Sequence, residues 1–415
     1  MKPYPVKHYL LLAACALPLG LFAQQDKEQR SPKNGNNKSY TIEQATSDRA
    51  QLHTIAFDGL AWLTGSFGAD CFFPPGKVAD YFGFQYMRDN DKNSMGHNTD
   101  FLTRIANNVI SILNTDQLNT LIALAKQQES LYTEFAQKRM VLIKAFRQQL
   151  EGPIPAGKSK LNKAAVVKFC SDLYAIDGEL SYARAAAMGA IIRSFTPEQK
   201  KAFDQLDFSN SATWPVLEEK LDKRSMSHRA HVGVMTYASE LFSWYKGSVT
   251  ADVYFCPERH GTYFGGFYLK DYPAMGNHGY SISTALTGDA GKSFLDILND
   301  EQRRLIEEIP AVQKPDLTAM VDTRKAIAEL LRKFIEGQTP DKASVINLAR
   351  KYGGEDGAMS YEYATRFSTV NQTLTPEQKE KMKVLRNLDV FPKGAYLYSD
   401  PIEIPASLET TALFN

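Results

Sequence analysis

The stretch that decides the fold spans residues 116–150 and reads DQLNTLIALAKQQESLYTEFAQKRMVLIKAFRQQL. Its apolar residues recur three and four positions apart over many turns, which places them on one face of an α-helix. Gly152 and Pro153 follow shortly after, and this pair is a usual helix stop. Three further stretches have helical periodicity: residues 50–63, 163–194 and 230–245. The sequence therefore predicts an all-α protein.

The second half of the chain repeats the first half in order. Asp177 and Gly178 correspond to Asp356 and Gly357. Other matched pairs are WLTGS (62–66) with WYKGS (244–248), YFGFQYMRD (81–89) with YFGGFYLKD (263–271), and TPEQK (196–200) with TPEQK (375–379). An ordered series of matches indicates a repeat architecture. We predict two tandem repeats of a helical-bundle domain, each with a long aromatic-rich loop.

The start of the chain has the pattern of an export signal. Lys2, Lys7 and His8 give a positive start, an apolar run occupies residues 9–21, and the small residue Ala23 precedes a polar stretch. We expect cleavage after this residue and a periplasmic or extracellular location. A lipobox-like Leu-Ala-Ala precedes Cys15, which leaves lipid attachment and an uncleaved anchor open as alternatives. We expect contact with a membrane only if Cys15 is lipidated.

These patterns divide the chain into five predicted parts. They are a signal peptide (1–23), a disordered tether (24–40), helical repeat 1 (41–211), helical repeat 2 (212–391) and an extended C-terminal tail (392–415). Residues 24–38 of the tether are polar and include no apolar residue to bury. The 48 Lys and Arg residues balance the 47 Asp and Glu residues, so no global charge favours nucleic acid as a partner.

Four short motifs share the arrangement of a helix start. They are LNTDQ (113–117), FTPEQ (195–199), LNDEQ (298–302) and LTPEQ (374–378). In each motif, Asn or Thr suits the N-cap, an acidic residue follows near the positive helix end, and Gln can close a capping box. The sequence predicts four capped helix starts at these positions.

These motifs resemble the LTxxQ motif of the periplasmic Spy/CpxP-type family. Residues 374–378 match that motif in full, and each of the other three departs from it at one position. The resemblance implies an exported helical protein with a role in envelope stress or protein-folding assistance, and in relatives in metal sensing. The aromatic loops are not a feature that we associate with this family.

The aromatic loops are the first candidate for a binding site. Glycines between the rings allow close approach of a backbone or a ligand. The candidate ligand-binding residues are Tyr81, Phe82, Phe84, Tyr86 and Arg88 in the first repeat, and Tyr263, Phe264, Phe267, Tyr268 and Lys270 in the second. They could line a groove for an apolar small molecule, a peptide or an unfolded protein, with charged residues at its rim. Alternatively, the rings close the ends of the helical bundles and pair across the duplication.

Methionine, histidine and cysteine provide the second candidate. Met95 and His97 recur as Met275 and His278, and thioether and imidazole groups suit copper in an oxidising compartment. Since Asn277 is the residue that aligns with the first histidine, such a ligand set is not simply duplicated. Cys71 and Cys256 occupy near-equivalent places and could form a disulfide between the repeats. The pattern around Cys170 predicts a buried thiol.

Acidic residues of the long helices provide a third candidate, which the sequence does not favour. Asp177, Glu179, Glu355, Asp356 and Glu362 could gather inside a bundle, but the ExxH pairs of di-iron proteins are absent there. The sequence places no obvious base beside Ser181 or Ser360.

Our leading hypothesis is an exported, non-enzymatic binding protein, with a chaperone-like role included. The alternative is a metal- or cofactor-binding protein for redox chemistry or sensing. The identity of any cofactor stays open, and an enzyme of unrecognised type ranks third.

Overall fold

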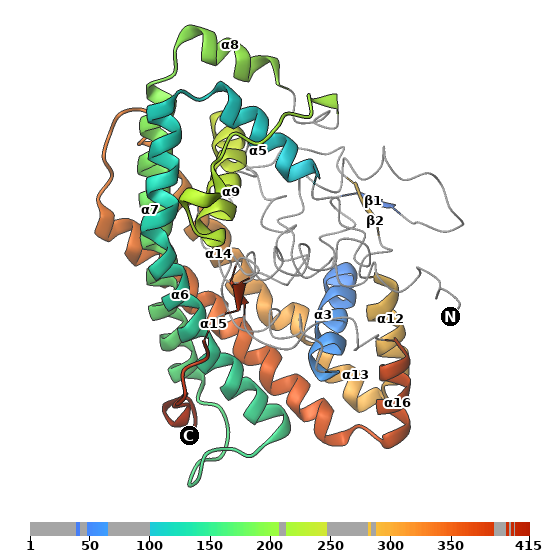
Figure 1. Cartoon of the computed structure of the whole chain (residues 1–415). Helices are drawn as coiled ribbons and strands as arrows, with labels where there is room; N and C mark the ends of the chain where they lie inside the picture. Colours follow the sequence, from blue (N-terminus) through green and yellow to red (C-terminus); the bar gives the residue numbers. More distant parts are fainter. Residues whose placement is uncertain are drawn as a thin grey trace.

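A computed structural model of the chain describes residues 39–41, 48–64, 100–206, 213–246, 281–283, 288–385, 396–397, 400–401 and 403–415. The described chain is mostly helical, which confirms the predicted all-α class (Figure 1). Two short antiparallel ladders accompany the helices. They pair β1 (Ser39–Thr41) with β2 (Ser281–Ser283), and β3 (Tyr396–Leu397) with β4 (Asp400–Pro401).

The helices form two series, one on each side of the predicted limit between residues 211 and 212. The first series is α3 (Asp48–Leu63), α5 (Asp100–Ile112), α6 (Thr115–Glu151), α7 (Lys163–Arg193) and α8 (Pro197–Gln205). The second series is α9 (His228–Tyr245), α12 (Gly288–Ile297), α13 (Asp300–Glu307), α14 (Ile309–Arg332), α15 (Lys342–Thr373) and α16 (Pro376–Leu385). The four helices predicted from periodicity are confirmed as α3, α6, α7 and α9.

Helix α6 begins and ends where the sequence predicts. The Asn114 side chain accepts from the Gln117 backbone N–H, and the Gln117 side chain accepts from the Asn114 N–H, so the capping box is complete. At the other end, Gly152 has a φ of 71°, a conformation that favours glycine, and its N–H donates to the Gln148 carbonyl. The other three predicted capping boxes form as well, at Gln199, Gln302 and Gln378.

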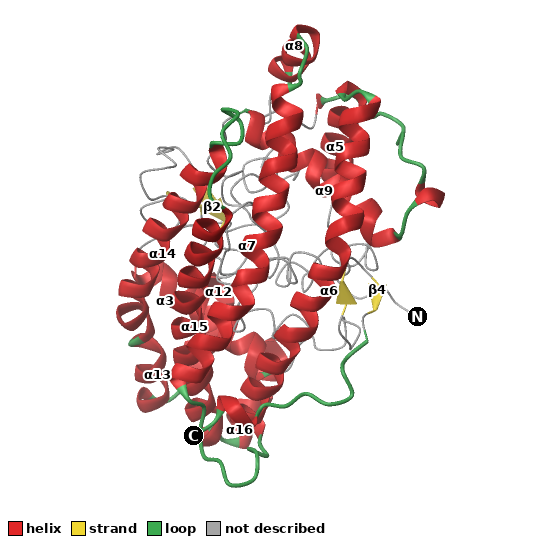
Figure 2. Ribbon diagram, turned by 90° about the vertical axis from the view of Figure 1, so that its left-hand side faces the viewer, coloured by secondary structure: helices red, strands yellow, loops and turns green. Residues whose placement is uncertain are grey.

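The long helices α7 and α15 run antiparallel in close contact along the middle of the molecule (Figure 2). A Cβ atom on Gly178 would lie 2.7 Å from the Cβ of Ala349, and one on Gly357 would lie 2.7 Å from the Cβ of Cys170. The two glycines of the repeated Asp-Gly motif therefore let the helix backbones approach each other. Cys170 is buried, as predicted.

The first helix of each series packs on the other series. Helix α3 lies against α12, and α9 lies against α5 (Figure 1). Contact between α3 and α12 is so close that a side chain on Gly291 would overlap the His53 carbonyl. The ladder of β1 and β2 also joins the two series, because β1 precedes α3 and β2 precedes α12. Packing thus extends across the limit predicted between residues 211 and 212, and one hydrophobic cluster contains side chains from both series.

The C-terminal segment packs on the first series. Leu413 and Phe414 are buried, and Phe414 forms an isolated β-bridge with Leu161. The Asn162 N–H donates to the Leu413 carbonyl at 2.8 Å, and the Asn415 N–H donates to the Lys160 carbonyl at 2.8 Å. Residues 403–415 therefore link the end of the chain to the loop between α6 and α7. Within the described ranges, no helix has the length and apolar character needed to cross a bilayer.

The first prediction concerns the contact between α7 and α15. Gly357→Ala is expected to lower the free energy of unfolding, because overpacking costs about 1–3 kcal/mol against a helix-propensity gain of about 1 kcal/mol. Gly354→Ala on the same helix is the matched control, since its Cβ would meet only the Val167 Cγ1, at 3.7 Å. Urea unfolding midpoints measure both variants. Equal midpoints for the two variants would contradict the close contact.

Candidate functional site

The residues proposed from the sequence as ligand, metal and disulfide sites lie outside the described residues. The aromatic set comprises Tyr81, Phe82, Phe84, Tyr86, Arg88, Tyr263, Phe264, Phe267, Tyr268 and Lys270. The metal set comprises Met95, His97, Met275 and His278, and the disulfide pair is Cys71 with Cys256. These assignments stay predictions. The two aromatic segments are residues 65–99 and 247–280. The structure does describe the helices that flank them.

Each aromatic segment follows a tryptophan that an arginine holds in place. Arg147 of α6 donates to the Trp62 carbonyl at 2.9 Å, and its guanidinium lies 5.7 Å from the centre of the Trp62 ring. Arg332 of α14 donates to the Trp244 carbonyl at 3.2 Å and lies 5.6 Å from that ring. Each arginine thus satisfies a helix-terminal carbonyl and makes a cation–π contact with the same residue. We call these two pairs the Trp–Arg anchors.

The helices that flank the two aromatic segments pack in two pairs, and each pair takes one helix from each series. The first segment runs from α3 to α5, and the second runs from α9 to α12. Since α3 packs on α12 and α9 packs on α5, each segment starts in one helix pair and ends in the other. The four attachment points therefore belong to one connected frame.

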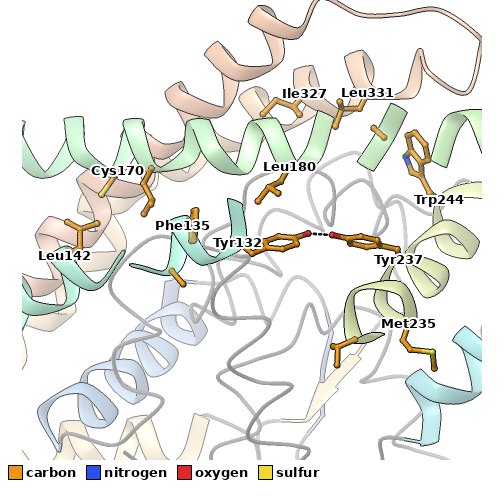
Figure 3. Close-up of a cluster of buried hydrophobic side chains, with 14 of the residues drawn as sticks. Tyr132, Phe135, Leu142, Cys170, Leu180, Met235, Tyr237, Trp244, Ile327 and Leu331 are labelled. Carbon is orange, nitrogen blue, oxygen red and sulfur yellow. Dashed lines mark hydrogen bonds between the residues drawn. The ribbon is translucent and has the colours of Figure 1, made fainter. Parts of the chain in front are cut away.

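A buried tyrosine pair joins α6 to α9. Figure 3 shows Tyr132 and Tyr237 with their hydroxyl groups facing each other, and the two oxygens are hydrogen-bonded. The Tyr237 hydroxyl donates to the Gln128 Oε1 at 2.6 Å, and the Gln128 side-chain amide donates to the Leu180 carbonyl of α7 at 3.0 Å. Burial raises the pKa of the Tyr237 phenol, and Tyr132 raises it further. The network joins three helices with neutral groups.

A buried ion pair lies beside this network. The Arg184 Nη1 of α7 is 3.4 Å from each carboxylate oxygen of Glu240 on α9, with 4% and 6% of the two side chains exposed. Burial is the largest effect and lowers the pKa of the Arg184 guanidinium, but Glu240 together with Tyr132, Tyr237 and Asp177 outweighs it, so the net pKa is raised. Arg184 Nη2 also donates to the Ser181 hydroxyl at 3.3 Å. This serine therefore has a cation beside it, which cannot serve as a base.

The carboxylates considered from the sequence do not share one site. Asp177 and Asp356 are fully buried, and the Tyr174 hydroxyl donates to the Asp356 Oδ2 at 2.8 Å. Glu179 pairs with Lys342 at 3.1 Å, and Glu362 pairs with Lys163 at 2.9 Å, both near the surface. In the part of the chain that the structure describes, no group of three or more His, Cys, Asp or Glu side chains could hold a metal ion.

The glutamines of the four capped helix starts form two hydrogen-bonded pairs, which the sequence did not predict. The Gln117 Nε2 donates to the Gln199 Oε1 at 3.2 Å, and the reverse bond is 2.7 Å. Gln302 and Gln378 exchange the same two bonds at 3.3 and 2.8 Å. Each of these four glutamines therefore closes its own capping box and also connects its helix start to a second one. The same spacing of three residues from the N-cap to the glutamine in all four motifs is the signal that could have indicated a shared role.

No protein-family model, curated protein or solved structure matches this chain. Its function is therefore inferred from its own residues and their geometry.

The second prediction concerns the buried ion pair of Arg184 and Glu240. Arg184→Met should cost about 3–5 kcal/mol of unfolding free energy, because it leaves the Glu240 charge buried. Combining it with Glu240→Gln should restore part of this loss. The exposed pair Lys138–Glu134 is the control, with side chains 54% and 46% exposed, and its removal should cost at most about 1 kcal/mol. A double-mutant cycle from denaturant curves measures the coupling, and strictly additive losses would contradict a direct ion pair.

Proposed function

We propose that the protein is an exported, non-enzymatic binding protein whose two aromatic segments form one shared cleft. The observation that carries this proposal is the pair of Trp–Arg anchors, which hold both segments at equivalent points of one helical frame. A segment that begins at a rigid anchor loses less conformational entropy when it binds a ligand. The crossed helix pairs further support a shared cleft, because both segments span the same two helix pairs.

We infer that the frame arose from two tandem copies of one helical unit. Equivalent contacts support this inference, because Trp62 with Arg147 matches Trp244 with Arg332. The glutamine pairs match as well, and the glycine contacts of α7 and α15 are reciprocal. Reciprocal contacts of this kind are typical of an isologous, two-fold interface. A duplicated frame would present two similar aromatic surfaces to one ligand.

The ligand class follows from the chemistry of the aromatic segments. Phenylalanine and tyrosine rings offer a large apolar surface, and Arg88 and Lys270 would form a polar rim. We therefore propose an apolar small molecule or an extended, unfolded peptide as the ligand. The peptide option agrees with the chaperone-like role that the Spy/CpxP-type resemblance implies. Export through the N-terminal signal remains part of this proposal.

The third prediction concerns ligand binding by the mature chain. The chain expressed from Gln24 should bind an anilinonaphthalene dye and aromatic-rich unfolded peptides, and fluorescence titration measures both. Replacing Tyr81, Phe82, Tyr263 and Phe264 by serine should weaken binding about tenfold or more, since each lost ring removes apolar contact area. Val216→Ser is the matched control, because this side chain is already 82% exposed in a described loop.

Two results would contradict the proposal. One is binding that survives all four serine substitutions while circular dichroism shows the fold intact. The other is a stoichiometric metal or a chromophore in the purified mature chain, found by elemental analysis and absorption spectroscopy. That second result would favour the redox or sensing alternative and direct substitutions to Met95, His97, Met275 and His278.

A further inference from the structure

The contact between α14 and α15 holds an ionisable side chain where the first half has an apolar one. Glu355 of α15 is only 12% exposed. Its counterpart on α7 is Ile176, because Asp177 corresponds to Asp356 in the repeated motif. Ile176 packs against the hydrophobic core. The frame thus provides a partly buried position in both halves, and only the second half places a carboxyl group there.

The hydrogen bonds of Glu355 leave one oxygen unsatisfied. Its Oε1 accepts from the Thr323 hydroxyl of α14 at 3.3 Å and lies 3.9 Å from the Lys351 ammonium. Its Oε2 is buried and has no hydrogen-bond partner among the described residues. A buried ionised oxygen without a donor is costly, whereas a protonated oxygen at the same place carries no charge.

The charged groups around Glu355 act on its ionisation in both directions, and burial favours the neutral form. Helix α14 contributes two acids, Asp316 and Asp322, while α15 contributes Lys351. Helix α7 contributes Lys163, which acts on Asp316. Burial is the largest cause that raises the pKa of Glu355, to about 7, with the two acids adding to it against Lys351 and the Thr323 hydroxyl. Burial raises the pKa of Asp316 as well.

We propose that the contact between α14 and α15 is a proton-dependent latch, closed while Glu355 carries a proton and loosened when Glu355 ionises. Ionisation would place a new negative charge beside Asp316 and Asp322 and leave Oε2 charged and buried. Admitting water between the helices relieves both costs, so the stretch of α14 from Asp316 to Thr323 would open. This device is independent of the ligand proposed above.

The direction of the pH effect follows from proton linkage. The folded chain holds the Glu355 proton more tightly than the unfolded chain does. Its contribution to stability is therefore complete below the unfolded pKa of a glutamate, and it is lost as the pH rises through the folded pKa near neutrality. The latch should close in mildly acidic solution and open in mildly alkaline solution.

Hydrogen exchange on the full mature chain tests the latch. After correction for intrinsic exchange rates, protection of the α14 amides should fall above neutral pH, by up to about tenfold per pH unit. Helix α6 is the internal reference, because it should not show this fall. Glu355→Gln keeps the side chain neutral and should abolish the pH dependence. Glu329→Gln, at an exposed position of α14, is the control and should leave the pH dependence unchanged.

A second variant keeps the test decisive if Glu355→Gln does not fold. Asp316→Asn combined with Asp322→Asn removes the repelling charges, so the midpoint of the transition should move to lower pH. The latch is overturned by a flat profile for the unmodified chain, or by an unchanged pH dependence in Glu355→Gln. An unmoved midpoint in the double variant overturns it as well.

Discussion

The close approach of α7 and α15 is the constraint on which the rest of the structure depends. It requires Gly178 and Gly357, because a side chain at either position would overlap the facing helix. Both helices are long, with 31 and 32 residues, so their contact extends through much of the described frame. Helix α6 packs on α7, and α14 packs on α15. The positions of these outer helices, and of the arginines that hold Trp62 and Trp244, follow from the central contact.

Polar groups inside this frame make the arrangement specific. Apolar packing alone tolerates small shifts of one helix along another, whereas hydrogen bonds and ion pairs require defined positions. The bond from Gln128 to the Leu180 carbonyl sets α6 against α7, and the pair of Arg184 with Glu240 sets α7 against α9. A buried ion pair is weak evidence for added stability. We infer that its main effect here is to select one arrangement of the helices.

The two series of helices differ at the stretch that aligns in sequence with α6. Helix α6 is continuous over 37 residues, whereas the corresponding stretch is divided into α13 and α14. Pro310 lies in the first turn of α14 and Pro315 lies inside it. Proline removes a backbone donor, which explains why this stretch does not form one regular helix. Glu355 lies beside this less regular helix.

The sequence by itself determined helices α3, α6, α7 and α9, four capped helix starts and the glycine stop of α6, because these features depend on residues a few positions apart. It also indicated the buried Cys170 and the internal correspondence of the two halves. Only the tertiary structure revealed the crossed packing of α3 and α9, the glutamine pairs, the Trp–Arg anchors and the ion pair of Arg184 with Glu240. These contacts join residues far apart in the chain, often across the predicted repeat limit. Periodicity shows which face of a helix is buried but not which helix will cover it.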